Sequence, residues 1–221
     1  MQSNNISCII FDFDGVIANT DLGRYKILKR IFSDFDESIY IPFTHKDLIG
    51  LSTKGFLNKI SKKLTDNQIE NIIKKRHEIF FSNLSEFCIP YDNMADTIKE
   101  LYTKFDLAIT TTNDVDNVKV QLNYLGILNC FKWVIGRDFT ENSNLEKTYH
   151  KIPHILQREV SECIVVEDSD FGVNAAIKEG FYCIRFDPDN LFSKGLENEK
   201  VFNYNELREM INKNTTRQHR V

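Results

Sequence analysis

Short runs of apolar residues alternate along the chain with segments whose apolar residues recur every three or four positions. The first pattern is typical of strands buried on both faces of a parallel sheet, and the second is typical of helices with one buried face. The expected strands are Ile6–Phe11, Leu107–Thr110, Trp133–Ile135, Cys163–Val166 and Tyr182–Arg185. The expected helices between them are Met94–Lys104, Val115–Leu125 and Phe171–Lys178. This alternation predicts an α/β fold with a doubly wound parallel sheet.

One long stretch after the first strand contains helical spacing and no convincing strand. Its expected helices are Tyr25–Phe32, Gly55–Leu64 and Gln68–Phe81. Thr65 or Asp66 is the expected N-cap of the third helix. We therefore expect a small helical domain at residues 19–87, inserted into an α/β core made of residues 1–18 and 88–221.

The composition is that of an ordinary globular protein, with 42% hydrophobic and 27% charged residues among 221. The formal net charge of −4 gives no reason to expect a nucleic-acid partner. No apolar run approaches the ~20 residues that cross a bilayer, so no membrane partner is expected. The five cysteines are odd in number and lack metal-binding spacing, which favours free thiols in a reducing, cytoplasmic compartment. We expect a monomer or a weak dimer.

The first candidate for chemistry is the sequence Asp12-Phe13-Asp14-Gly15 at the end of the first strand. In an open parallel sheet, ligands bind outside the carboxyl ends of the strands. Two acids at such an end cannot both be buried without a partner, and a hard divalent cation such as Mg²⁺ would provide one. The alternative is a pair of acids in an ordinary solvated turn.

A second acid pair, Glu167 and Asp168, ends the fourth expected strand. Asp170 could cap the following helix, and Gly172 would let that helix begin close to the site. Capping alone could explain either acid pair by itself. Two pairs at the same edge of one sheet favour a shared metal site.

Two further segments would suit a phosphate group. Thr111, Thr112 and Asn113 follow the second expected strand and offer hydroxyls and an amide near a helix N-terminus, although a simple capping cluster would look the same. Lys147 lies between the third and fourth strands, and Lys151 is the alternative to it. A cation is needed because two unit charges of the same sign at ~4 Å repel by about 4 kcal/mol at an effective dielectric constant of ~20.

Together these four motifs resemble, in residue type and order, the haloacid dehalogenase superfamily of phosphohydrolases, from Ile6 to about Arg185. The helical insertion resembles the small helical cap of phosphoglycolate phosphatases and β-phosphoglucomutases. Gly50 and Ser52 resemble the loop by which such caps reach the site, and Arg24 stands near a position where the mutases often carry histidine. The resemblance implies a Mg²⁺-dependent phosphatase that acts on a small phosphorylated metabolite through an aspartyl-phosphate.

The resemblance also implies a role for each motif residue. Asp12 would be the nucleophile and Asp14 the general acid and base. The phosphoryl group would be held by Thr111, Thr112, Asn113 and Lys147, and Mg²⁺ by the side chains of Asp12, Asp168 and Glu167 and the backbone carbonyl of Asp14. A phosphosugar mutase and a non-catalytic, ligand-binding member remain as alternatives. The family's usual Lys-Pro-x-Pro sequence is absent around Lys147.

Overall fold

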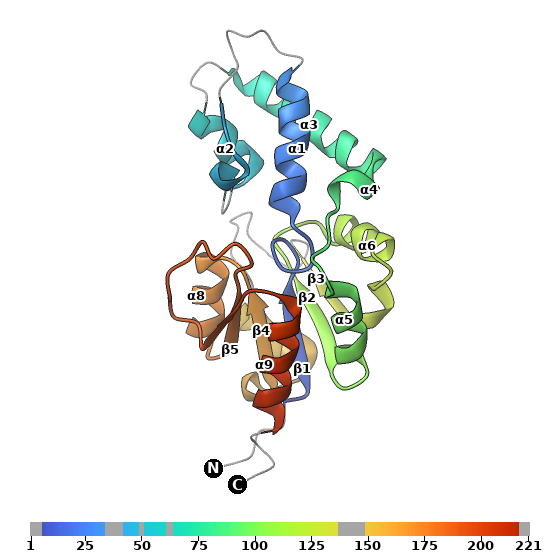
Figure 1. Ribbon diagram of the computed structural model, residues 1–221, viewed down its shortest axis with the longest axis vertical. Coiled ribbons are helices and arrows are strands. Elements are labelled where there is room, and N and C mark those ends of the chain that lie inside the picture. Colours follow the sequence, from blue (N-terminus) through green and yellow to red (C-terminus); the bar gives the residue numbers. More distant parts are fainter. Residues whose placement is uncertain (1–5, 34–41, 49–50, 61–63, 137–148, 217–221) are drawn as a thin grey trace. The chain divides into compact units, whose positions relative to one another are not determined.

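The computed structural model describes residues 6–33, 42–48, 51–60, 64–136 and 149–216. The chain divides into two compact units (Figure 1). Unit 1 combines residues 1–18 with residues 90–221, and unit 2 comprises residues 19–89.

Unit 1 is built on a six-stranded sheet in the order β3-β2-β1-β4-β5-β6, and every neighbouring pair of strands is parallel. The strands are β1 (Cys8–Asp12), β2 (Asp106–Thr110), β3 (Trp133–Ile135), β4 (Cys163–Glu167), β5 (Tyr182–Phe186) and β6 (Glu199–Val201). The doubly wound parallel sheet expected from the sequence is therefore confirmed, together with the five strands predicted for it. The edge strand β6 was not predicted.

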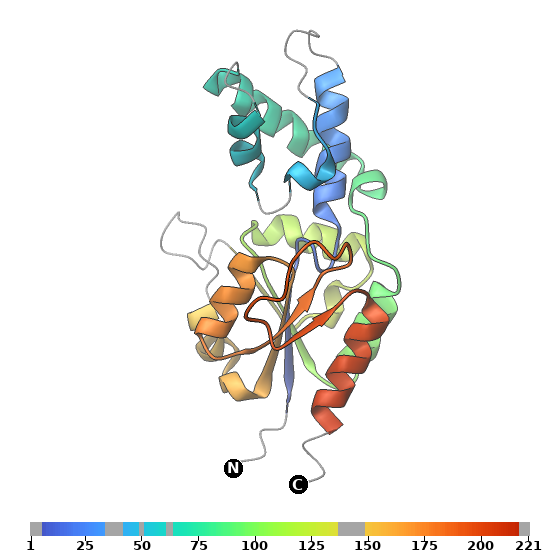
Figure 2. The ribbon, with the colours of Figure 1, turned by 60° about the vertical axis from the view of Figure 1, so that its left-hand side comes forward.

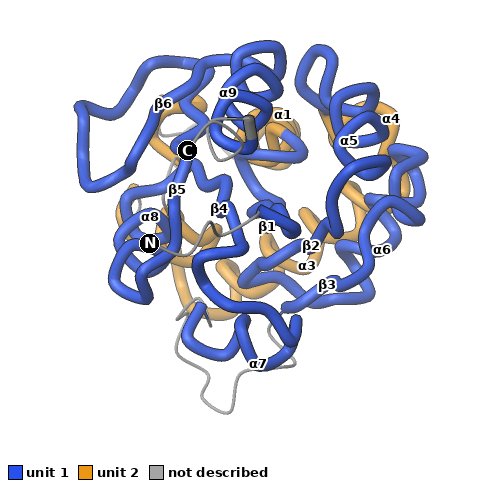
Figure 3. The backbone as a smooth tube through the Cα atoms, turned by 90° about the horizontal axis from the view of Figure 1, so that it is seen from below, with its two compact units in different colours: residues 1–18, 90–221 blue, residues 19–89 orange. Residues whose placement is uncertain are grey.

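Helices cover both faces of this sheet. They are α5 (Met94–Tyr102), α6 (Val115–Tyr124), α7 (Ile152–Leu156), α8 (Asp170–Lys178) and α9 (Tyr204–Thr216), with short 3₁₀ turns η2 (Leu128–Cys130), η4 (Tyr149–Lys151) and η5 (Val160–Glu162). Figure 2 shows α8 and α9 on opposite sides of the strands, and Figure 3 shows α5 beside α9 on one face of the sheet and both α7 and α8 on the other. This two-sided cover explains why β1 and β4 are buried along their whole length.

Contacts between the sheet and its helices also hold the loop that follows β1. Val173 and Ala176 of α8 pack in a cluster with Ile10 and Val165 of the strands. On the other side, the fully buried hydroxyl of Tyr204 donates a hydrogen bond of 2.9 Å to the carbonyl of Val16. The loop after β1 is thus tied to α9.

Unit 2 is entirely helical in its described residues. Its elements are α1 (Thr20–Ser33), η1 (His45–Leu48), α2 (Thr53–Ile60), α3 (Asp66–Ser82) and α4 (Leu84–Phe87). Thr65, rather than Asp66, caps α3, because its side chain accepts from the amide of Gln68 while the Gln68 side chain binds the amide of Thr65. Aromatic rings pack in its interior, with Phe43 centred 5.9 Å from Phe32 and 5.1 Å from Phe56.

All five cysteines are free, as expected, and all five are buried. None of the described helices is long and apolar enough to cross a membrane. The role of residues 19–87 as a substrate cap remains a prediction.

Candidate active site

The carboxyl ends of the three central strands bring the predicted motifs together. β1 lies between β2 and β4, and Asp12, its last residue, pairs in register with Thr110, the last residue of β2. Glu167 is the last residue of β4, on the other side of β1. Side chains that are far apart in the sequence therefore meet at one edge of the sheet.

Three carboxylates form a cluster at this edge. Asp12, Glu167 and Asp168 each place one oxygen so that the three atoms lie within 4.8 Å of one another. Asp12 is 4% exposed and Glu167 is fully buried. At this spacing each pair of ionised carboxylates repels by roughly 3–4 kcal/mol at an effective dielectric constant of ~20. A set of oxygen ligands with this much negative charge fits a hard divalent cation such as Mg²⁺.

Two glycines make room for these carboxylates. Gly15 has a φ of +78°, and a Cβ atom placed on it would lie 2.0 Å from Oδ2 of Asp168. A Cβ atom on Gly172 would lie 2.1 Å from Oε2 of Glu167. Any larger residue at either position would displace a carboxylate of the cluster. The prediction that Gly172 lets α8 begin close to the site is confirmed.

The prediction that Asp170 caps α8 is wrong. Ser169 is the N-cap, and its Oγ accepts a hydrogen bond of 3.1 Å from the amide of Gly172. Asp170 is instead the first residue of α8, and its carboxylate lies 2.7 Å from Nη2 of Arg185. Ser169 has the extended backbone of an N-cap residue, which places its side-chain oxygen over the first free amides of the helix, whereas Asp170 is already helical.

Tyr149 belongs to the site, although nothing in the sequence indicated it. Its hydroxyl is buried and donates a hydrogen bond of 2.7 Å to Oε1 of Glu167. Burial, followed by the negative charges of Glu167 and Asp12, raises the pKa of Tyr149 well above its usual value. The hydroxyl therefore keeps its proton and orients the Glu167 carboxylate.

The loop after β2 forms a second side of the site. The amide of Thr111 donates to the carbonyl of Ile135 at 2.9 Å, and the amide of Asn113 donates to Oγ1 of Thr111 at 3.1 Å. The side-chain amide of Asn113 then donates to Oδ2 of Asp14 at 2.7 Å. This last bond joins the two loops that carry the predicted phosphate-binding residues and the predicted general acid. Thr112, which lies between Thr111 and Asn113 in the sequence, is partly exposed.

The predicted lysine cannot be placed at this site. Lys147 lies outside the described residues, as does Gly50. The alternative, Lys151, ends η4 two residues after Tyr149 and is partly exposed.

The other predicted cap residues have contacts within unit 2. Arg24 donates to the carbonyl of Leu51 at 2.5 Å and to that of Leu48 at 2.6 Å. Ser52 accepts from the amide of Gly55 at 3.0 Å at the start of α2. Arg24 therefore holds the segment that carries Ser52, and Ser52 begins the helix after it.

Comparison with known proteins agrees with this arrangement. A family model described as "Haloacid dehalogenase-like hydrolase" matches residues 9–186, which include the acid cluster and most of unit 1's sheet. The chain belongs to this family. The resemblance inferred from the four motifs is thereby confirmed, and the protein is a hydrolase.

Individual known proteins are similar to this chain over most of their length. YhcW of Bacillus subtilis is 28% identical over 81% of this chain and 82% of its own. The pyrophosphatase PpaX of Listeria monocytogenes is 22% identical over 87% of this chain and 94% of its own. The structure of a haloacid dehalogenase-like hydrolase from Streptococcus pneumoniae superposes with a TM-score of 0.76 at 17% identity, covering 96% of this chain and all of that one.

Proposed function

We propose that this member of the family is a Mg²⁺-dependent phosphatase of small phosphorylated metabolites. The observation that carries the proposal is the cluster of Asp12, Glu167 and Asp168 at the carboxyl edge of the sheet. The names of relatives such as the pyrophosphatase PpaX support the choice of phosphate chemistry. The bound cation would supply positive charge that offsets the repulsion between Asp12 and an anionic phosphate.

In the proposed reaction Asp12 is the nucleophile. One oxygen of its carboxylate bonds to phosphorus, the bond from phosphorus to the ester oxygen breaks, and Asp14 gives its proton to that oxygen. Asp14 then takes a proton from water, whose oxygen attacks the phosphorus and releases inorganic phosphate and free Asp12. Thr111, Thr112 and Asn113 lie on the adjacent loop, where they would hold the phosphoryl oxygens. Lys147 remains the proposed cation of the chain itself.

Two alternatives make different products. A phosphosugar mutase would return the phosphoryl group to the sugar, so a hexose 1-phosphate would become its 6-phosphate without release of inorganic phosphate. A non-catalytic member would bind the phosphorylated ligand and leave it unchanged. Analysis of products from hexose phosphates, together with a screen of phosphorylated metabolites for released phosphate, separates these possibilities.

The decisive experiment measures hydrolysis of para-nitrophenyl phosphate with Mg²⁺ and with excess chelator. We expect activity only with the cation, and we expect Asp12→Asn to remove it because the amide has nearly the same shape but is not an anionic nucleophile. Asp96→Asn is the matched control, since Asp96 is exposed on α5. Full activity in chelator would refute the metal requirement, and an active Asp12→Asn variant would refute the nucleophile.

A further inference from the structure

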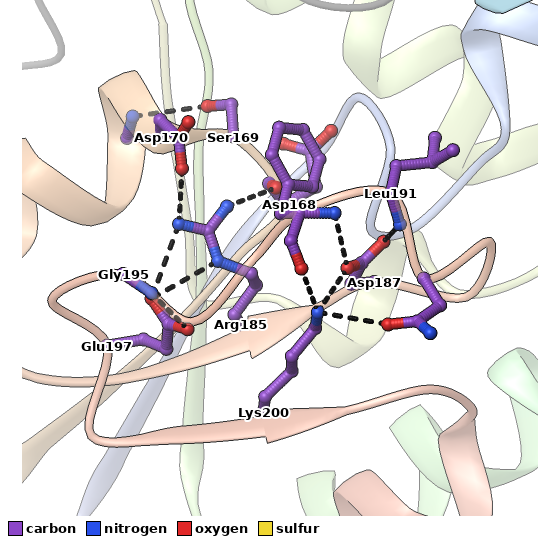
Figure 4. A network of polar contacts seen from close by, with 12 residues as sticks. Asp168, Ser169, Asp170, Arg185, Asp187, Leu191, Gly195, Glu197 and Lys200 are labelled. Carbon is purple, nitrogen blue, oxygen red and sulfur yellow. Dashed lines mark hydrogen bonds and ion pairs between the residues drawn. The ribbon is translucent and has the colours of Figure 1, made fainter.

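Arg185 is fully buried near the carboxyl end of β5, and its side chain joins separate segments of unit 1 (Figure 4). Its Nη1 donates a hydrogen bond of 3.0 Å to the backbone carbonyl of Asp168. Its Nη2 lies 2.7 Å from Oδ1 of Asp170, in the first turn of α8. Its Nε lies 3.3 Å from Oε2 of Glu197, which precedes β6. The guanidinium therefore ties the turn that carries Asp168 to the segment between β5 and β6.

Glu197, one of the partners of the guanidinium, is itself held in place. Glu197 is 4% exposed, and both of its carboxylate oxygens accept from the amide of Gly195, at 2.9 and 3.0 Å. The ring of Phe192 is centred 4.8 Å from Cζ of Arg185. With Glu197 held by Gly195 and the Phe192 ring against it, the guanidinium presents Nη1 to the Asp168 carbonyl from a defined position.

Stability alone does not account for a charged residue here. Replacing a buried ion pair by apolar residues of similar volume is often neutral or stabilising. An apolar side chain, however, could not donate to the carbonyl of Asp168. That carbonyl belongs to the residue whose carboxylate lies against Gly15 and completes the acid cluster.

We propose that Arg185 is a positioning residue that fixes the main chain of Asp168 and so sets the direction of its carboxylate toward Asp12 and Glu167. The inference rests on the proposed function, because it takes Asp168 as a cation ligand. The planar guanidinium can bind the Asp168 carbonyl, Asp170 and Glu197 at once. A lysine keeps the charge but concentrates it on a single nitrogen atom, so it cannot reproduce the planar arrangement of donors that makes these three contacts.

The test is direct cation binding to the full-length protein, with Mn²⁺ as the probe and free Mn²⁺ measured by electron paramagnetic resonance. We expect Arg185→Lys to bind Mn²⁺ about tenfold more weakly than the wild type, the lower end of the loss usual when a partner of a metal ligand is changed. Asp168→Asn marks the site, because it should remove binding at the cluster. Thermal unfolding in chelator is measured on the same samples.

Lys200→Met is the matched control. Lys200 belongs to the same network and lies 2.7 Å from Oδ2 of Asp187, and it also donates to Oδ1 of Asn190 at 3.2 Å (Figure 4). It also donates to the backbone carbonyl of Phe192, and no contact described for its side chain is with Asp168 itself. We expect Lys200→Met to lower the unfolding temperature without changing the affinity for Mn²⁺.

Each outcome decides the inference. Weaker binding in Arg185→Lys with unchanged binding in Lys200→Met supports it. Unchanged Mn²⁺ binding in Arg185→Lys overturns the inference and leaves the proposed metal site intact. The same holds if Mn²⁺ binding weakens in both Arg185→Lys and Lys200→Met in proportion to the stability that each variant loses. A wild type that binds no Mn²⁺ refutes the proposed metal site, and the inference with it. If Arg185→Lys does not fold, the double variant Arg185→Met with Glu197→Gln replaces it. Glu197→Gln removes the buried negative charge that the loss of Arg185 would otherwise leave uncompensated.

Discussion

At the scale of single residues, we expect the hydroxyl of Tyr149 to contribute measurably to the free energy of unfolding. It donates to Glu167, which is fully buried. Tyr149→Phe keeps the ring and removes only this donor. Loss of a partner from a buried polar group costs about 1–3 kcal/mol, so we expect the free energy of unfolding to fall by that amount. Urea denaturation in excess chelator measures it without a contribution from bound cation.

Tyr102→Phe is the control for this change. Tyr102 is 53% exposed on α5, so the same loss of a hydroxyl should change the free energy of unfolding by no more than about 0.5 kcal/mol. Equal effects of the two substitutions would mean that the bond between Tyr149 and Glu167 contributes nothing to stability.

Gly15 offers a second test at the same scale. Gly15→Ala places a methyl group at a φ of +78° and 2.0 Å from Oδ2 of Asp168. Gly126→Ala places the same group at a φ of +69°, where no atom lies within 4 Å. The left-handed backbone should cost both variants roughly 1–2 kcal/mol of stability. Only Gly15→Ala should also weaken cation binding and phosphatase activity, because only there must Asp168 move. Parallel unfolding and Mn²⁺ titrations of the two variants would reveal the difference, and equal Mn²⁺ affinities would contradict it.

At the scale of elements, the sequence predicted those strands and helices that a local pattern of apolar residues marks. The central strands are continuous apolar runs because both of their faces are covered, and this marked them in the sequence. β6 has three residues, of which only Val201 is buried, so it carries no recognisable period. The acid cluster was predictable because strand ends in a parallel sheet share one edge. The contacts of Tyr149 and Arg185 with the site were not predictable. Their partners Glu167 and Asp168 lie 18 and 17 residues away in the sequence, and strand register and packing bring them close.

The segment that joins β5 to β6 should depend on pH. Burial alone would raise the pKa of Asp187, but the ammonium of Lys200 and the amides of Leu191 and Phe192 hold that pKa below its usual value. A carboxylate with a lowered pKa in the folded state stabilises the protein above its unfolded pKa of ~3.9, and this contribution is lost as the pH falls through the folded value.

Asp187→Asn should therefore be less stable than the wild type at pH 7, and the difference should shrink below about pH 4. Denaturant unfolding of both proteins from pH 7 to pH 3 measures this difference. A difference that stays constant over that range would show that ionisation of Asp187 does not anchor the segment.

At the scale of the whole molecule, the chain leaves unit 1 and returns to it at neighbouring points. Ala18 forms an antiparallel bridge with Pro90, and the amide of Asn19 donates to the carbonyl of Ile89 at 2.8 Å. Partners in such a bridge lie ~5 Å apart, a gap that about two glycines can span. Unit 1 also has its own sheet and its own covering helices. Residues 19–89 could therefore be replaced by a short linker without moving a strand.

We expect the shortened protein to fold and to hydrolyse para-nitrophenyl phosphate with Mg²⁺, because Asp12, Asp14, Thr111, Glu167 and Asp168 all belong to unit 1. If unit 2 is the substrate cap, the same protein should lose the preference of the full chain among natural phosphate esters. Ratios of kcat/KM for a panel of esters measure that preference, and Asp12→Asn in the shortened chain shows that any remaining activity comes from the same site. An unchanged preference would show that unit 2 does not select the substrate. A shortened chain that unfolds would instead show that unit 1 requires unit 2 for stability, contrary to the independence inferred from its core.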